Sequence, residues 1–289
     1  MTHRRARSLV TIILVLSLLC TSALAETDEG EATTAASWRP WLSIGFDLRA
    51  QDVEAGFASD SVPLLEGGVR SSRAMESELI LVPNISFESA LESPPIFDAW
   101  GKPRLFAHAG GKLPTKIAHK IFRDEGPEGD SSLGRSANHD YRFKFDGSWF
   151  AGLGVAWSVP LGERQLSIRP AFDYFGEHVR WEGMSLLLER EAGAPTSALP
   201  TPVFAASRSL SKTYHAIGPS LALEVLLGQR GPVSLKLYAQ SQFYWILTDP
   251  EASFAVANEI GSGNGVIRFE TDSMIAEGGV GVRLTWLPR

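Results

Sequence analysis

The stretch Val233–Leu247, VSLKLYAQSQFYWIL, alternates apolar and polar side chains along its whole length. Its odd-numbered residues are mostly apolar and end in Trp245 and Leu247, whereas its even-numbered residues include Lys236 and Gln240. A period of two predicts a β-strand with one apolar and one polar face. In a soluble barrel the apolar face points inward. In an outer-membrane barrel it points outward to lipid, and the polar face lines the interior.

The N-terminal region has the pattern of a secretory signal peptide. Three arginines within 1–7 precede an apolar run over 8–19, and small residues end the segment at Ala25. The run is shorter than the roughly 20 residues of a transmembrane helix, so we expect cleavage rather than a membrane anchor. Residues 26–37 are acidic and lack periodicity, which predicts a flexible periplasmic lead before a barrel over 38–289.

The composition argues against several classes of function. The single cysteine, Cys20, lies in the predicted signal, so the mature chain has no disulfide and no catalytic or metal-binding thiolate. Loss of the three signal arginines leaves 24 of 27 basic residues against 33 acidic ones, a net charge of −9. Such a chain is not expected to bind nucleic acid. We also expect no cofactor and no metal, because no histidine pair has a convincing metal-ligand spacing.

Eight segments carry the alternating pattern of the opening stretch. They cover residues 38–49, 75–90, 103–112, 147–159, 166–175, 217–225, 233–247 and 279–286. Long connections alternate with short ones: the long ones span 50–74, 113–142, 183–209 and 248–264, and the short ones 91–102, 160–164 and 227–232. This asymmetry predicts an all-β, eight-stranded antiparallel transmembrane β-barrel with long extracellular loops and short periplasmic turns. Extra strands or an inserted plug would most readily lie in 113–142.

Charged residues of the polar faces are predicted to form a network inside the barrel. The candidates are Asp47, Arg49, Glu78, Arg104, Arg169, Asp173, Glu224, Lys236 and Arg283. Eight strands leave an interior that side chains just fill, so we favour a salt-bridged plug, with pairs such as Glu224 with Lys236 and Arg169 with Asp173 or Glu224. The alternative is that the same charges line a narrow channel for small or apolar solutes.

Tryptophans on the apolar faces are predicted to mark the membrane boundaries. Trp149 and Trp157 share one face eight residues apart, about 20 Å along the membrane normal for a strand tilted near 40°. By the same parity Trp245 belongs to the outer aromatic girdle and Trp286 to the inner one. The alternative is that these rings fill the core of a soluble sandwich.

The architecture resembles small bacterial outer-membrane barrels of the OmpA-type transmembrane domain, OmpX-like and OmpW-like kind. The resemblance implies a final strand that the barrel-assembly machinery recognises. Here Val280, Val282, Leu284 and Trp286 match that pattern, but three residues, 287–289, follow the aromatic residue and the usual terminal phenylalanine is missing.

The sequence therefore favours a porin-like outer-membrane protein of a Gram-negative bacterium with a structural or surface-interaction role. We expect a monomer that contacts outer-membrane lipid and lipopolysaccharide. The enzymatic alternative is modification of lipid A, as on some barrels of this size, which carry a histidine and a serine two residues apart on the lipid face. His215 has lipid-facing parity, but residue 217 is isoleucine, so this nucleophile is missing and no catalytic residue is assigned.

Overall fold

The computed structural model describes residues 37–97, 101–114, 118–125, 135–161, 164–191, 193–195 and 197–286, and every regular element among them is a strand. The predicted signal peptide, 1–25, and most of the lead, 26–37, lie outside the described residues. No helix in the described part of the chain is long and apolar enough to cross a membrane. The eleven strands are β1 Arg39–Pro63, β2 Val69–Pro95, β3 Arg104–Pro114, β4 Ala118–Glu125, β5 Ser136–Leu161, β6 Arg164–Glu189, β7 Thr201–Arg230, β8 Val233–Ile246, β9 Glu251–Ala257, β10 Asn264–Thr271 and β11 Met274–Trp286.

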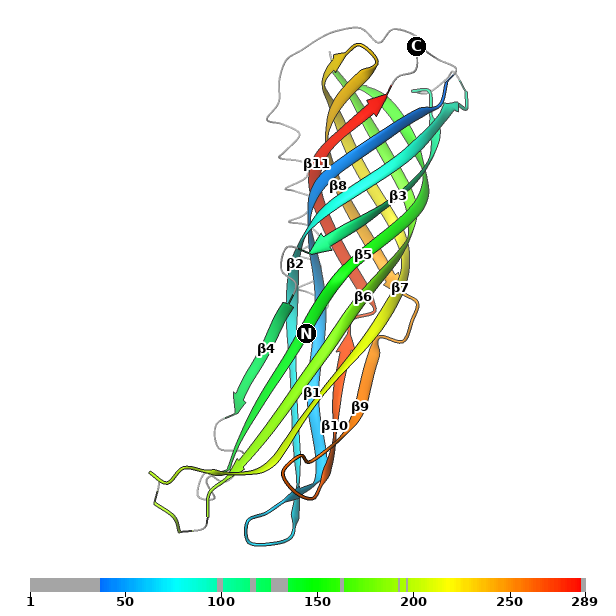
Figure 1. Cartoon of the computed structure of the whole chain (residues 1–289). Coiled ribbons are helices and arrows are strands. Elements are labelled where there is room, and N and C mark those ends of the chain that lie inside the picture. Colours follow the sequence, from blue (N-terminus) through cyan, green and yellow to red (C-terminus); the bar gives the residue numbers. More distant parts are fainter. Residues whose placement is uncertain are drawn as a thin grey trace.

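Eight of these strands close into an antiparallel ring in the order β1-β2-β3-β5-β6-β7-β8-β11 (Figure 1). The closing ladder joins β11 to β1, with Leu42 opposite Leu284 and Phe46 opposite Val280. Tight connections join β5 to β6 and β7 to β8 at the end of the ring where β1 begins and β11 ends. A closed ladder has no unpaired edge, which is what hydrocarbon requires of a spanning β-structure.

The long connections between the predicted strands are themselves largely β-structure. Strands β1, β2, β5, β6 and β7 run for 25, 27, 26, 26 and 30 residues, whereas a membrane needs about 9–11 residues per strand. The expected loop 113–142 contains β4 and the first part of β5. The ring therefore continues into a long extension, seen below the tilted strands in Figure 1.

The extension consists of two four-stranded sheets that grow out of the ring. One has the order β9-β10-β1-β2 and the other β4-β5-β6-β7. Among the described residues no ladder joins β2 to β4 or β7 to β9. Asn258 bridges the second seam, where its side chain accepts a hydrogen bond from the Ala205 amide at 3.0 Å and donates one to the Val203 carbonyl at 3.0 Å.

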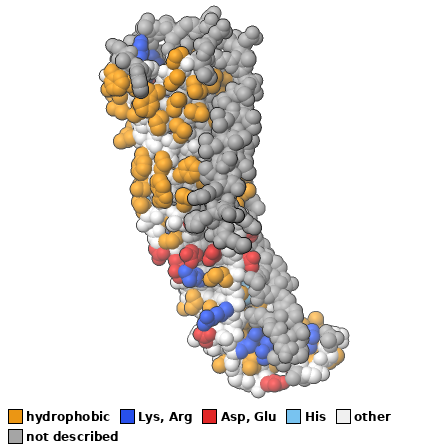
Figure 2. Space-filling model, turned by 180° about the vertical axis from the view of Figure 1, so that it is seen from behind, with side chains coloured by type: hydrophobic (Ala, Val, Ile, Leu, Met, Phe, Trp, Pro, Cys, Tyr) orange, Lys and Arg blue, Asp and Glu red, His pale blue; other side chains and the backbone are white. Residues whose placement is uncertain are grey.

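The chemistry of the two faces reverses along a single strand. In the first part of β1 the outward residues Leu42, Ile44 and Phe46 are exposed, while Asp47 and Arg49 are buried. Further along the same strand the inward residues become Val53, Ala55 and Phe57, all buried, and the outward ones include Asp52, Glu54 and Asp60. The apolar face therefore points out in the ring and in towards the core of the extension. Figure 2 shows a hydrophobic band followed by acidic and basic side chains.

Aromatic rings from both sheets form the core of the extension. Phe269 of β10 lies between rings of the opposite sheet, with its centroid 4.9 Å from that of Trp181 and 5.5 Å from that of Phe143. Phe57 and Phe204 make a second contact between the sheets at 5.2 Å. A β-sandwich buries the facing sides of its sheets in this way, so the extension is held by its own apolar core.

Strand β5 changes register where the ring meets the extension. Its pairing with β6 shifts between Phe145 and Ser148, and Gly147 within the shift has a φ of +118°. A side chain is disfavoured at that φ, and a glycine at a bulge lets the strand bend. The bend lies just beside Trp149, the predicted marker of the outer membrane boundary.

Candidate functional site

The interior of the ring is crossed by a network of buried ion pairs that begins at Arg283 on β11. Its Nη2 lies 3.0 Å from Oε2 of Glu88 on β2, and its Nη1 pairs with Glu224 on β7. The guanidinium also lies 3.6 Å from the ring centroid of Trp41 and 4.9 Å from that of Tyr238. A planar guanidinium can stack on aromatic rings and still bind carboxylates, which suits this position.

Glu224 forms ion pairs with three cations that come from three different strands. Its Oε1 lies 2.7 Å from Nε of Arg169, its Oε2 lies 3.7 Å from Nζ of Lys236, and it pairs with Arg283. Arg169 reaches on to Glu92, so the network continues to β2. Burying a charge without a partner is very unfavourable, and Glu224 is a partner for all three cations, with Glu92 and Glu88 as second partners of Arg169 and Arg283.

His108 links two acids across the same interior. Its Nδ1 lies 2.5 Å from Oε1 of Glu88, and its Nε2 lies 2.8 Å from Oδ1 of Asp173 on β6. Gly152 of β5 lies directly beside this bridge: a Cβ atom there would be 2.6 Å from Nε2 of His108 and would also collide with Asp173. The absence of a side chain at residue 152 therefore makes room for the bridge.

A second layer of the network is centred on Lys112 of β3. Its Nζ pairs with Glu277, lies 2.5 Å from Oε1 of Gln242, and lies 3.9 Å from Oδ2 of Asp47. Gln240 donates a hydrogen bond of 3.0 Å to Oδ1 of the same aspartate. This layer joins β1, β3, β8 and β11 across the ring.

Arg49 forms the last ion pair before the apolar core of the extension. It pairs with Glu177 on β6 and donates a hydrogen bond to Gln51. Its Cζ lies 5.2 Å from the ring centroid of Phe145 and 5.9 Å from that of Phe175. The polar interior therefore ends in a layer where aromatic rings already surround the charge.

A small cavity lies between these side chains. This cavity of about 20 Å³ is lined by parts of both layers, including Glu88, His108, Arg169, Gln242 and Arg283. A single water molecule needs about 10–15 Å³ of such space. The cavity is therefore of the size of one water molecule, and the arrangement packs the interior with paired charges.

The structure brings most of the predicted network residues together. Arg169, Glu224, Lys236 and Arg283 form one cluster, and the remaining buried members are Asp47, Arg49, Arg104 and Asp173. Arg104 lies apart from the cluster and donates a hydrogen bond of 2.8 Å to the Ser93 carbonyl. The proposed pair of Arg169 with Glu224 is present.

Glu78 was wrongly placed in the interior. It is exposed, and it lies opposite Val53 in the part of β2 that belongs to the extension. The face that carries Glu78 lines the ring only nearer to the other end of β2, where Glu88 and Glu92 are buried. The position along the strand, and not parity alone, decides which environment a residue meets.

Several members of the network were missing from the sequence-based set. They are Glu92, Lys112, Glu177 and Glu277, whereas Glu88 and His108 have the interior parity that the sequence predicts. Glu177 has the parity of Asp173, Glu277 that of Arg283, and Lys112 that of His108. Lys112 lies inside the predicted segment 103–112, and the same parity, continued past the limits of the predicted segments, would have found the other three.

The predicted girdle and assembly residues lie on the outer surface. Trp149, Trp245 and Trp286 are exposed, and Trp157 is half-buried. Val280, Val282, Leu284 and Trp286 are all exposed on the outward face of β11. Trp149 and Trp245 lie at the end of the ring nearer the extension, and Trp157 and Trp286 at the opposite end.

His215, the histidine considered for catalysis, packs against an aromatic side chain. Nδ1 of His215 lies 2.9 Å from the hydroxyl of Tyr174, and the two rings stack at 5.8 Å. Tyr174 in turn contacts Trp149 at 5.5 Å. No group of three or more histidine, cysteine or acidic residues that could hold a metal ion is found in the described parts of the chain.

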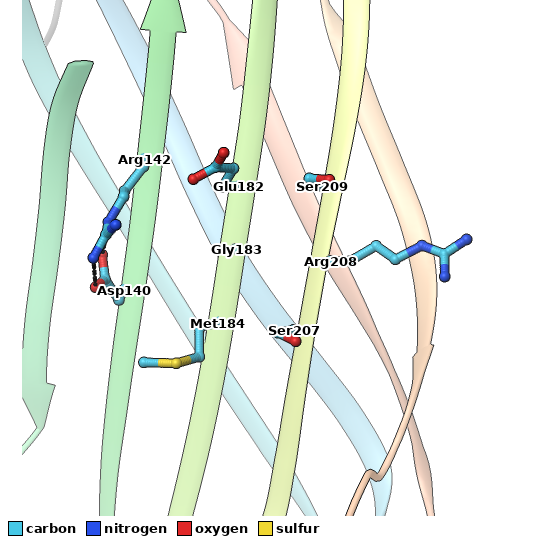
Figure 3. A pocket seen from close by; sticks show the side chains of 8 residues that line it. All are labelled: Asp140, Arg142, Glu182, Gly183, Met184, Ser207, Arg208 and Ser209. Carbon is cyan, nitrogen blue, oxygen red and sulfur yellow. Dashed lines mark hydrogen bonds and ion pairs between the residues drawn. The ribbon is translucent and has the colours of Figure 1, made fainter.

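A polar groove of about 640 Å³ lies on the outside of the extension over β5, β6 and β7. Figure 3 shows Asp140 and Arg142 on β5, Glu182 and Met184 on β6, and Ser207 and Ser209 on β7, while Arg208 extends away from the others. Arg142 donates two hydrogen bonds to Asp140, from Nη2 at 3.1 Å and from Nε at 3.4 Å. The Asp140 carboxylate raises the pKa of Arg142.

The closed antiparallel ring, the charged interior and the apolar outer surface define a transmembrane β-barrel of the small outer-membrane class. No family model and no curated protein matches the sequence.

Among solved structures, the chain is similar to Ail of Yersinia pestis, crystallised with the heparin analogue sucrose octasulfate, at 8% identity and a TM-score of 0.30, covering 86% of this chain and 99% of that one. A major outer membrane protein of Thermus thermophilus gives 9% identity and a TM-score of 0.31, covering 82% and 99%. The outer membrane protease OmpT of Escherichia coli gives 12% and 0.20, covering 90% and 100%. Likeness at this level carries no argument, so the class rests on the topology and surface of this chain.

Proposed function

We propose that the protein is a sealed outer-membrane barrel that holds a β-sheet extension outside the cell, with a structural or surface-interaction role. The observation that carries the proposal is the ion-pair network from Glu92 and Arg169 to Arg49 and Glu177. A cavity between these paired charges has the volume of about one water molecule. An open channel would need a continuous wet path along the same axis.

The extension supplies a second seal beyond the first. Its core, which includes Phe57, Trp181, Phe204 and Phe269, lies between the two sheets that continue from the ring. Tightly packed aromatic rings leave no hydrated path between them. The two seals in series favour the structural role over the narrow channel.

The proposal includes a monomer embedded in lipid and lipopolysaccharide. The ring closes within one chain, because β11 pairs with both β8 and β1, so no second copy is needed to satisfy an edge. The barrel-assembly machinery would meet Val280, Val282, Leu284 and Trp286 on β11 during insertion. Export would use residues 1–25, and sequencing of the mature protein from outer membranes is expected to begin at Glu26.

Planar-bilayer recording of the purified protein tests the seal. We expect no discrete conductance steps at any applied voltage, because the described residues fill the ring with paired charges and the extension with an apolar core. Protease accessibility of the extension in the same membranes shows that the protein has inserted. Regular conductance steps from inserted protein would contradict the proposal and support the channel.

A further inference from the structure

Two ion pairs lie in and beside the groove on the extension. Arg142 binds the buried Asp140, and Nζ of Lys144 lies 2.6 Å from Oε1 of Glu182 beside it. Arg208, the other cation of the lining, extends away from these pairs (Figure 3), and a third carboxylate, Glu259, accepts a hydrogen bond from Ser207. Three cations therefore stand against three carboxylates, and their charges cancel. A strongly anionic or cationic ligand would have to displace one of these pairs, whereas an uncharged polar ligand can use their remaining donors and acceptors.

The rest of the lining has the chemistry of a site for hydroxyl groups. Ser209 is exposed and offers a hydroxyl that both donates and accepts, and Met184 is an exposed apolar side chain on the neighbouring strand. The hydroxyl of Ser207 already donates to Oε1 of Glu259 at 2.8 Å. A sugar presents hydroxyls around its edge and CH groups on its face. The volume, about 640 Å³, lies within the usual range of small-molecule sites.

The height of the groove above the membrane indicates what surrounds it. Glu182 is six residues beyond Gly176, the residue that pairs with Trp149 of the outer girdle, and Ser209 is six residues from His215 in the same rung. Six residues of a strand tilted near 40° span roughly 15 Å along the membrane normal. In the outer leaflet this height lies beyond the lipid phosphates, where the sugars of lipopolysaccharide begin.

We propose that this groove binds an uncharged segment of the oligosaccharide of the surrounding lipopolysaccharide. The inference rests on the outer-membrane location in the proposed function and adds the partner and the residues that meet it. Arg142 and Glu182 supply directed donors and acceptors, Ser209 adds a hydroxyl, and Met184 contacts the CH face of a sugar ring. Because Asp140 is buried and holds the guanidinium of Arg142 by two hydrogen bonds, one wall of the site is ordered before the sugar arrives.

The test compares two substitutions on the same face of β7. Ser209→Trp fills the groove, whereas Ser211→Trp places the same ring two residues away, outside the groove lining. The probe is the delipidated oligosaccharide from lipopolysaccharide of the bacterium that carries the protein, titrated calorimetrically into full-length protein in detergent. We expect the wild type and Ser211→Trp to bind alike and Ser209→Trp to bind at least about tenfold more weakly.

Three results would overturn the inference. The first is an absence of binding to the wild type, and the second is equal binding by Ser209→Trp. The third is displacement of the oligosaccharide by millimolar inorganic phosphate, which would mark a site for charge alone. Equal binding of maltoheptaose would replace lipopolysaccharide by free glycans as the partner. Heat-modifiable migration in gels checks that both variants are folded. Bilayer conductance tests the sealed barrel separately, so a failure of the proposed function can be told apart from a failure of the groove to bind the oligosaccharide.

Discussion

The guanidinium of Arg283 lies 3.6 Å from the ring centroid of Trp41 while it pairs with Glu88 and Glu224. The aromatic face replaces part of the hydration that the cation loses inside the ring. The two carboxylates come from β2 and β7, so this single side chain connects β11, through the centre of the ring, to strands that are not its neighbours in the ladder. The network therefore braces the ring from within.

Glu224→Gln is expected to destabilise the whole ring. The substitution keeps the size of the side chain but removes the carboxylate shared by Arg169, Lys236 and Arg283. Removal of one partner of a buried ion pair typically costs about 3–5 kcal/mol, because the other charge stays buried without compensation. Urea unfolding in lipid vesicles measures the loss. Glu66→Gln, on an exposed residue between β1 and β2, is the matched control, and equal stability of the two variants would show that the network does not brace the ring.

A charged substitution on the outward face of the ring is expected to lower the stability of the protein, whereas one on the outward face of the extension is expected to change it little. Leu153 lies midway between Trp149 and Trp157 and is 70% exposed, whereas Val266 is exposed on β10 of the extension. An arginine at the middle of a membrane strand costs about 2–4 kcal/mol. Unfolding in vesicles should therefore show this loss for Leu153→Arg and little change for Val266→Arg. A similar loss in both variants would place the extension in lipid as well.

The closed ring could be predicted from the sequence because lipid and a polar interior impose opposite demands on alternate residues. That contrast is strong in Val233–Leu247, where parity separates Lys236 from Leu235 and Leu237. The connections of unequal length predict which end of the ring faces the periplasm. These features are local, and a single sequence displays them directly.

The extension could not be predicted from the alternation because its apolar side chains point inward, whereas those of the ring point outward. Residues Val53, Ala55 and Phe57 continue the parity of Asp47 and Arg49 with apolar instead of charged side chains. The alternation with one constant apolar face ends at this point, so the sequence predicts a loop over 50–74. Glu78 lies in this extension and not in the ring, so its interior parity does not bring it into the charged network.

Most partners in the candidate site could not be assigned from one sequence. Arg49 and Glu177 are 128 residues apart and meet across the interior, so neither parity nor spacing connects them. Parity shows that a charge points inward but not which carboxylate it reaches, because that depends on how far each strand is shifted along its neighbour. The groove of Arg142 and Glu182 has the same origin in cross-strand register.

Phe269→Ala is expected to loosen the extension and leave the ring intact. The substitution removes the ring that packs against Trp181 and Phe143 from the opposite sheet. Loss of a buried phenylalanine costs about 3–5 kcal/mol, and the two seams without ladders offer little to hold the sheets together otherwise. Limited proteolysis should cut the extension faster, while heat-modifiable migration of the ring persists. Val266→Ala, on the outer face of the same strand, is the control. Unchanged proteolysis of Phe269→Ala would show that the aromatic core does not hold the extension.

Gly152→Val is expected to disrupt the bridge of His108 between Glu88 and Asp173. A Cβ at residue 152 would lie 2.6 Å from Nε2 of His108, and the valine methyl groups would need still more room. The imidazole must move, which leaves the two acids buried without it; overpacking alone costs about 1–3 kcal/mol. Gly111→Val is the matched control, because its Cβ would meet only the Ser148 carbonyl oxygen, at 3.4 Å. Unfolding midpoints in urea measure both variants. Equal shifts of the two midpoints would show that the stability depends on glycine in a strand generally and not on the space that Gly152 leaves for the bridge.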